Sequence, residues 1–353
     1  MSTTSYGVND ALAVKLWSKK LFQESLKKTY FSKFIGKSSS SVIQIKDETS
    51  KGPGDKITVG LRMQLTGDGV LEDGTLEGNE EALTTYSDAV YINQLRHAVR
   101  SAGKMSEQRV PFSVREEARA GLEDWWSNRL DTCFFNQLCG NTAVSDTRYT
   151  GNQAAIAPDA AHKIYLNGSA DESATSTYIF DITIIDKCVE KAKTATVPIR
   201  PVMVGGEEKY VMFLHPYQVY NLRTSTTTGQ WLDIQKAAMS GGKESGNPIY
   251  TGALGEYNGV VLHESTRVTK GVNSSTGVAI DSVRRSVFCG AQAGVMAYGK
   301  DAAGGEMNWV EELFDFKNQL GVAAGMIFGI KKAQFNSADF GTIVVPTYAV
   351  AHG

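Results

Sequence analysis

The sequence predicts an α+β fold with a long helix, several strands and a two-stranded arm that extends from the body. Three patterns support this: complete alternation over residues 56–66, an amphipathic helix over residues 113–138, and a second alternating run over residues 319–331. Alternation of apolar and polar side chains is typical of a strand, whereas apolar residues three and four apart indicate a helix. The chain has 353 residues, 42% of them hydrophobic, so it can bury one large core or several smaller ones.

The first alternating run begins at Lys56, and a second strand is predicted over residues 89–99. The connection between them holds four glycines, no lysine or arginine, and seven carboxylates: Asp68, Glu72, Asp73, Glu77, Glu80, Glu81 and Asp88. Charge repulsion and the entropy of glycine prevent such a segment from forming its own core. Because a lone two-stranded ribbon is marginally stable, we expect this arm to lie on a neighbouring molecule.

The long helix has recognisable ends. Ser113 and Glu116 form a capping box behind Pro111, and Gly140 suits the helix end. Its apolar face is broad and aromatic, as expected of a helix that supports a whole domain: Val114, Ala118, Leu122, Trp125, Trp126, Leu130, Cys133, Phe134 and Leu138.

The middle of the chain alternates polar and apolar segments. Residues 141–175 are polar and predict a surface loop, and a helix should follow Asp181. The part up to about residue 305 reads as a compact α+β domain. Its expected elements are a strand over 210–214, a helix after Pro216, another near Trp231, and strands near Val260 and Ser286.

The run over residues 319–331 has bulky side chains at even positions and mostly glycine or alanine at odd ones. Because glycine and alanine have little or no side chain, another backbone can approach this face closely. We therefore expect a long strand whose bare face lies against the long helix, followed by a last strand over residues 340–345.

The first 46 residues carry eight lysines and only two acids. Val14, Trp17 and Leu21 have helical spacing, which fits either a helix packed on its own domain or an arm reaching a neighbour or nucleic acid. Pairing between this basic segment and the acidic connection predicts contacts between subunits. The candidates are Lys15, Lys19, Lys20, Lys27, Lys28, Arg62, Asp68, Glu72, Asp73, Glu77, Glu80 and Glu81.

Enzyme chemistry has little support in the sequence. We find no nucleophile elbow, phosphate loop, zinc motif or dinucleotide fingerprint, so no catalytic, cofactor or metal residues are predicted. His215 could be a general base, but a capping or core role is the better interpretation. The cysteines Cys133, Cys139, Cys188 and Cys289 lie among apolar residues and are expected to be buried free thiols.

No membrane or secretion signal is evident. The longest apolar stretch, residues 320–330, has 11 residues, whereas a membrane span needs about 20. The first ten residues, MSTTSYGVND, lack the features of a signal peptide. With a net charge of −2, the chain is not a polycation that would coat nucleic acid.

A series of short segments, in order over about residues 50–345, resembles the major capsid (coat) proteins of tailed bacteriophages with the Hong Kong 97-type fold, in particular the coat protein family of short-tailed phages. The segments are GDKITV (54–59), LEGNEE (76–81), LRHAVR (95–100), NPIYTGALG (247–255), YNGVV (257–261), FN (335–336) and DFG (339–341).

The resemblance implies a domain plan and a set of partners. The plan is an N-terminal arm (1–45), an extended hairpin called the E-loop (46–100), a peripheral domain with a spine helix (101–195 and 306–340), an axial domain (196–305), and a C-terminal strand and tail (341–353). The implied function is self-assembly into pentamers and hexamers of an icosahedral virion head around double-stranded DNA, after synthesis in the bacterial cytoplasm. Implied partners are a separate scaffolding protein, a portal protein and decoration proteins.

Two alternatives remain open from the sequence. One is an encapsulin, a shell of the same fold that encloses cargo enzymes. The other is a cytoplasmic enzyme whose site the motifs do not reveal, with His215 as the candidate base.

Overall fold

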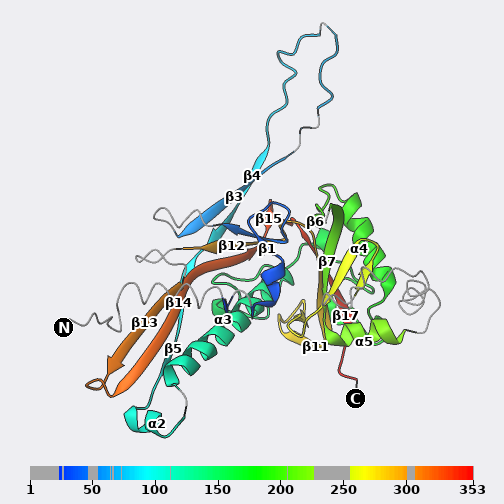
Figure 1. The fold of residues 1–353 in the computed structure, drawn as a ribbon. Coiled ribbons are helices and arrows are strands. Elements are labelled where there is room, and N and C mark those ends of the chain that lie inside the picture. Colours follow the sequence, from blue (N-terminus) through cyan, green and yellow to red (C-terminus); the bar gives the residue numbers. More distant parts are fainter. Residues whose placement is uncertain are drawn as a thin grey trace.

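The computed structural model describes residues 24–25, 28–46, 55–63, 65, 67–72, 74–111, 113–204, 206–225, 255–299 and 307–352. The helix expected near Trp231 and the one expected over residues 14–21 lie outside this part of the chain. Figure 1 shows two sheets side by side, a long helix along one of them, and a thin loop that projects far from the body.

The first sheet has six strands within the described residues and is organised around its longest strand, β14. β14 pairs antiparallel with three strands, and β2 extends the sheet in parallel through β12. The strands are β1 (Ile35–Gly36), β2 (Ile43–Lys46), β5 (Asn93–Arg100), β12 (Gly294–Tyr298), β13 (Met307–Phe314) and β14 (Gln319–Lys332).

The long helix was predicted correctly. α3 (Val114–Leu138) begins after Ser113, whose hydroxyl accepts a hydrogen bond from Glu116 N at 3.5 Å, and Gly140 follows its end with φ +61°. Its apolar face packs on the first sheet, where the Trp126 and Phe328 rings lie 6.1 Å apart. A short helix, α2 (Lys104–Gln108), precedes it.

The expected orientation of β14 is wrong. Its bulky even positions, such as Val322 and Phe328, face α3 and are buried there. The bare face lies on the other side, where strand β4 (Thr85–Tyr91) crosses it near Gly329. A Cβ on Gly329 would come within 2.0 Å of Tyr91 O, so the missing side chain admits the hairpin backbone instead of the helix.

The second sheet has seven strands in the described part of the chain and packs against α4 (Ile182–Thr194) and α5 (Pro216–Thr224). Asp181 caps α4, as expected. The strands are β6 (Val202–Val204), β7 (Glu207–Leu214), β8 (Gly255–Tyr257), β9 (Val260–Glu264), β10 (Lys270–Val272), β11 (Ala279–Cys289) and β17 (Thr342–Tyr348). The last strand, β17, therefore belongs to the second sheet, where it pairs with β11.

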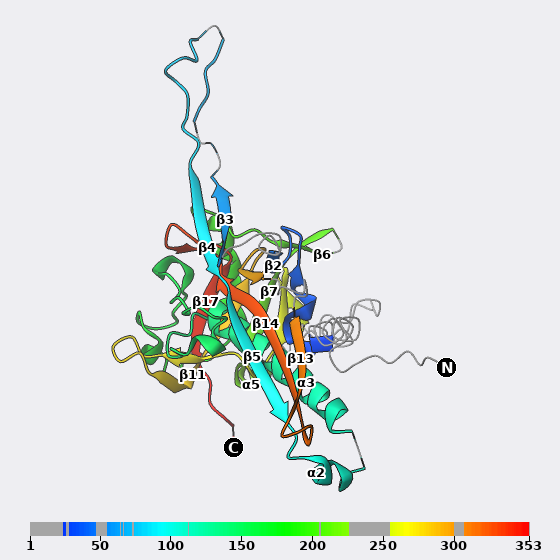
Figure 2. The same ribbon diagram turned by 90° about the vertical axis from the view of Figure 1, so that its left-hand side faces the viewer.

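The hairpin is shorter than the sequence predicted. β3 (Lys56–Arg62) pairs with β4 (Thr85–Tyr91), and the strand expected over residues 89–99 is divided at Ile92. Beyond that residue the chain continues as β5, which belongs to the first sheet. The hairpin is thus anchored by a strand of the first sheet. Figure 2 shows β4 continuing into β5 from a second direction.

Residues 141–175 are more than a surface loop. They form short 3₁₀ turns, η3 (Thr147–Tyr149), η4 (Ala160–His162) and η5 (Asp171–Ser173), and a similar turn, η1 (Tyr30–Lys33), lies before β1. Thr150 and Asp171 are buried, so this segment contributes to the interior despite its polar composition. A small ribbon of β15 (Gln334–Phe335) and β16 (Ala338–Asp339) completes the fold.

Two glycine substitutions should affect stability in opposite directions. Gly329→Ala should destabilise the protein by about 1–3 kcal/mol, because its Cβ would collide with the Tyr91 carbonyl. Gly121→Ala, in α3 with no atom within 4 Å of the added Cβ, should stabilise it by about 0.5–1 kcal/mol. Urea denaturation of both variants would measure the difference, and equal stabilities would contradict the crossing of the hairpin over β14.

Candidate intersubunit interface: the projecting loop and its anchor

The loop between β3 and β4 is extended and exposed over its described residues. Two of its carboxylates hold its own backbone: Glu81 accepts a hydrogen bond from Gly67 N and Glu80 one from Gly78 N, both at 2.7 Å. Asp68, Glu72 and Glu77 point to solvent and make no ion pair within the described residues. Asp73 lies outside them.

The loop also carries large apolar side chains, which the sequence reasoning missed as contact residues. They are Leu65, Leu71, Leu76 and Leu83, exposed by 56%, 87%, 63% and 57%. A row of exposed leucines on one thin segment differs from the scattered apolar residues of an ordinary surface. The alternation of residues 56–66 could have marked Leu65 as part of an apolar face. The leucines in the connection between the strands follow no such pattern, so the sequence gives no signal for them.

The basic candidates do not meet this loop within one chain. Lys28 pairs with Glu123 at 2.9 Å and Asp124 at 3.1 Å, both on α3 of its own chain. Arg62 ends β3 and is exposed. Lys15, Lys19, Lys20 and Lys27 lie outside the described residues, so their contacts stay predictions.

Asp88 belongs to the root of the hairpin, not to its acidic tip as the sequence suggested. Its carboxylate pairs with Lys331 of β14 and accepts a hydrogen bond from Gln334 N at 3.2 Å. Lys331 also donates to the carbonyl of Ala89 at 3.2 Å. We call the Asp88–Lys331 ion pair the root clamp. Beside it, the buried side chains of Ile57 and Val90 pack on residues of the first sheet, so the root of the hairpin is fixed by both charge and apolar contact.

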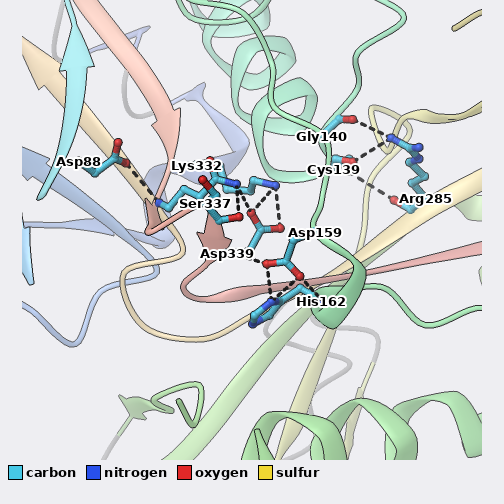
Figure 3. A network of polar contacts seen from close by, with 10 residues as sticks. Asp88, Cys139, Gly140, Asp159, His162, Arg285, Lys332, Ser337 and Asp339 are labelled. Carbon is cyan, nitrogen blue, oxygen red and sulfur yellow. Dashed lines mark hydrogen bonds and ion pairs between the residues drawn. The ribbon is translucent and has the colours of Figure 1, made fainter. Parts of the chain in front are cut away.

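The next residue, Lys332, makes a second clamp on the opposite side of β14. Lys332 and Asp339 are 2.8 Å apart and fully buried. Burial lowers the pKa of Lys332 and raises that of Asp339, and their mutual attraction opposes both shifts. Figure 3 shows this pair beside Asp159 and His162.

Asp159 connects the clamp to the segment before α4. It accepts a hydrogen bond from Asp339 N at 2.6 Å and pairs with His162 at 2.9 Å. Burial alone would raise the pKa of Asp159, but these bonds outweigh it and hold the pKa below its usual value. No hydroxyl or thiol is hydrogen-bonded to His162 in the described part of the chain.

A third buried pair joins the second sheet to the end of α3. Arg285 of β11 lies 2.6 Å from Asp171 and donates to the carbonyl of Gly140 at 2.7 Å, as Figure 3 shows for the carbonyl. Asp171 also accepts a hydrogen bond from Val272 N at 2.9 Å. These contacts hold the end of α3 against the second sheet. They explain why Asp171, expected in a surface loop, is buried.

His215 has the capping role that the sequence favoured. Its ring nitrogen accepts a hydrogen bond from Tyr217 N at 3.2 Å at the start of α5, and Gln218 completes the capping box. Burial, with a smaller effect of Arg284, lowers the pKa of His215 to about 4. All four cysteines are buried and free, as predicted.

The described residues offer neither a metal-binding cluster nor a membrane-spanning helix. No group of three or more His, Cys, Asp or Glu side chains is arranged to hold a metal ion among them. Within the same residues, every helix is too short or too polar to cross a membrane.

Comparison with known proteins now decides the family. The family model described as "Phage capsid protein" matches residues 5–351. The chain belongs to the phage capsid protein family. A curated relative, the major capsid protein of Pseudomonas phage KPP25, is 29% identical over 94% of this chain and 93% of its own length.

Solved structures agree with this capsid family. The capsid of Ralstonia phage GP4 is 36% identical, covers both chains completely and superposes with a TM-score of 0.78. The capsid of cyanophage Pam1 shares the fold at 19% identity, with a TM-score of 0.73 over 93% of this chain and 94% of that one. The Hong Kong 97-type fold expected from the sequence is therefore confirmed. As a phage capsid protein, the chain is located in the virion head.

The clamp at the hairpin root should contribute measurably to stability. Asp88→Asn should lower the free energy of unfolding by about 1–3 kcal/mol, because Lys331 loses its charged partner while mostly buried. Glu77→Gln, on the exposed loop, should change it by less than about 0.5 kcal/mol. Urea denaturation of the unassembled protein tests both, and equal effects would show that the clamp does not hold the root.

The buried histidine cap should make the fold acid-sensitive. The pKa of His215 is about 4 in the folded protein against the usual 6.5, so the unfolded chain takes up the proton first. The stability that His215 provides is therefore complete above pH 6.5 and declines by up to about 1.4 kcal/mol per pH unit as the pH falls toward 4.

His215→Asn keeps a good capping side chain that does not titrate in this range. Thermal denaturation at pH 7 and pH 4.5 should show a smaller loss for this variant than for the natural chain. The loss should not vanish, because burial also lowers the pKa of His263 to about 4. Identical pH dependence in both proteins would contradict the role of His215.

Proposed function

We propose that this chain is the major capsid subunit that forms pentamers and hexamers of an icosahedral head around double-stranded DNA, with its projecting loop lying across a neighbouring subunit. The observation that carries the proposal is the loop itself, an extended segment with exposed leucines and carboxylates that no described part of its own chain covers. Exposed apolar side chains in such a row mark an interaction surface.

The anchor supports this role. A loop that must reach the same place on every neighbour needs a fixed direction, and the Asp88–Lys331 pair and the apolar root supply it. Two different surfaces, the loop of one copy and the body of the next, make a heterologous contact, and such contacts close into rings when the rotation fits.

The domain plan carries over as part of the proposal. The first sheet with α3 corresponds to the peripheral domain, and the second sheet with α5 to the axial domain. α4, expected in the peripheral domain, packs on the second sheet, and the C-terminal strand β17 lies in that sheet as well. The N-terminal arm expected over residues 1–45 is in part a component of the body, because Phe31, Val42 and Ile43 are buried in its core. For residues 1–23, which lie outside the described residues, contact with a neighbour stays a proposal.

The partners follow from the same function. The chain carries a net charge of −2, which suits enclosure of DNA without sequence-specific binding. A separate scaffolding protein, a portal protein and decoration proteins would complete the head. We infer that the chain performs no catalysis, since His215 caps a helix, His162 pairs with Asp159, and His263 packs against the Phe34 ring. Particle contents separate this function from an encapsulin: DNA supports a phage head, and an enzyme cargo supports a compartment.

Neutralising the loop should impair assembly without unfolding the subunit. The variant replaces Asp68, Glu72, Asp73, Glu77, Glu80 and Glu81 with Asn or Gln and leaves Asp88 in place, because Asp88 stabilises the root. We expect fewer closed particles by negative-stain electron microscopy and an unchanged melting temperature. Exposed ion pairs contribute only about 0–1 kcal/mol each, so the charges are expected to guide assembly more than to strengthen it. Wild-type yields of closed particles from the variant would show that these charges do not guide assembly.

A further inference from the structure

A small cavity lies at the root of the hairpin, where β3 meets the body. Its volume is about 170 Å³, and most of its lining is apolar: Val59, Leu61, Val295, Ala333, Phe335 and Phe340. A cavity of roughly 150 Å³ accepts a group as large as benzene, so this one has room for an aliphatic side chain. Nothing else in the described fold fills it.

One side of the cavity is cationic. Arg200 lines it, is held by the side-chain oxygen of Gln292, and lies with its guanidinium 5.5 Å from the Phe340 ring centroid. No carboxylate pairs with Arg200 within the described residues. The cavity therefore combines an apolar interior with an arginine that can receive an anionic group.

The projecting loop carries the matching pair of side chains. Leu71 is 87% exposed, more than the other leucines of the loop, and Glu72 follows it in the left-handed conformation with φ +50°. The loop points away from its own hairpin root in both views, so Leu71 cannot reach the cavity of its own chain. A second copy presents the same dipeptide to this cavity without that restriction.

We propose that the cavity at the hairpin root receives Leu71 from the loop of a second copy, and that Glu72 of that copy pairs with Arg200. This inference rests on the proposed function and adds the docking point of the loop. Leu65 and Leu83 are each followed by threonine in the sequence and lack the adjacent carboxylate. Leu76 precedes Glu77 but is less exposed than Leu71, at 63%.

The first experiment compares two leucines of one loop. Leu71→Ala removes the side chain that fills the cavity, and it should raise the protein concentration needed for assembly about tenfold or more. Leu83→Ala, at a position exposed by 57% and without an adjacent carboxylate, should raise that concentration much less. Light scattering and negative-stain microscopy measure both, and an equal effect of the two substitutions, or none from Leu71→Ala, would overturn the docking point.

The second experiment exchanges charges. Glu72→Arg and Arg200→Glu should each impair assembly, and the double variant should restore it, since the reversed pair can form between copies. Melting temperatures would verify folding, and Arg200→Met replaces Arg200→Glu if the latter does not fold. In that case Glu72→Gln and Arg200→Met together should impair assembly no more than either alone. Failure of the reversed pair to restore assembly, or simple addition of the two neutral changes, would overturn the proposed pair.

The two levels of proposal fail differently. If the natural chain forms no closed particles under any assembly condition, the proposed shell function fails. If it forms them and the Leu71 and Arg200 variants form them equally well, the shell function stands and the docking point is wrong.

Discussion

The position of the loop depends on two adjacent lysines at the end of β14. Successive side chains of a strand point to opposite faces, so Lys331 and Lys332 act on opposite sides of the sheet. Lys331 holds Asp88 at the hairpin root, and Lys332 holds Asp339 in the interior. Because α3 packs on the same strand, the direction of the hairpin is coupled to the long helix through one rigid element.

The buried pair of Lys332 and Asp339 is costly to form and costly to break. Burial opposes the charge on both groups, yet removal of one partner would leave the other charged and without compensation. Such a pair adds little net stability but strongly disfavours arrangements in which β16 sits elsewhere. Asp159 extends this constraint to the segment before α4, and Lys163 of that segment forms a β-bridge with Val344 of β17 in the second sheet.

The sequence predicted the elements whose signals are local. α3, α4 and the cap of α5 were predicted because helix periodicity and capping residues act within a few positions. The division of the second hairpin strand at Ile92 was missed, because alternation continues across it while the pairing partner changes from β3 to β14. The direction of the bare face of β14 was predicted wrongly for a related reason. Glycine shows that a backbone comes close, but not whether it belongs to a helix or to a crossing strand.

The polar interior was beyond prediction from local patterns. Asp171 and Arg285 are 114 positions apart, and Asp171 lies in a segment whose composition is that of a loop. The candidate interface was predicted in part: the acidic connection does project, but Asp88 proved to be an anchor and Lys28 pairs with its own α3. Charge alone could not separate these roles, since a carboxylate at a root and one at a tip look alike in sequence.

The composition of the loop fits the proposed contact between subunits, which must be both accurate and reversible. Exposed ion pairs contribute about 0–1 kcal/mol each, whereas burial of one leucine contributes about 1.5–3 kcal/mol. Leucines can therefore supply most of the strength of a contact, while carboxylates limit which surface they meet. A thin loop with a few leucines makes each contact modest, so a misplaced subunit can dissociate. Many such contacts around a closed ring then add to a stable shell, provided that the root holds every loop in the same direction.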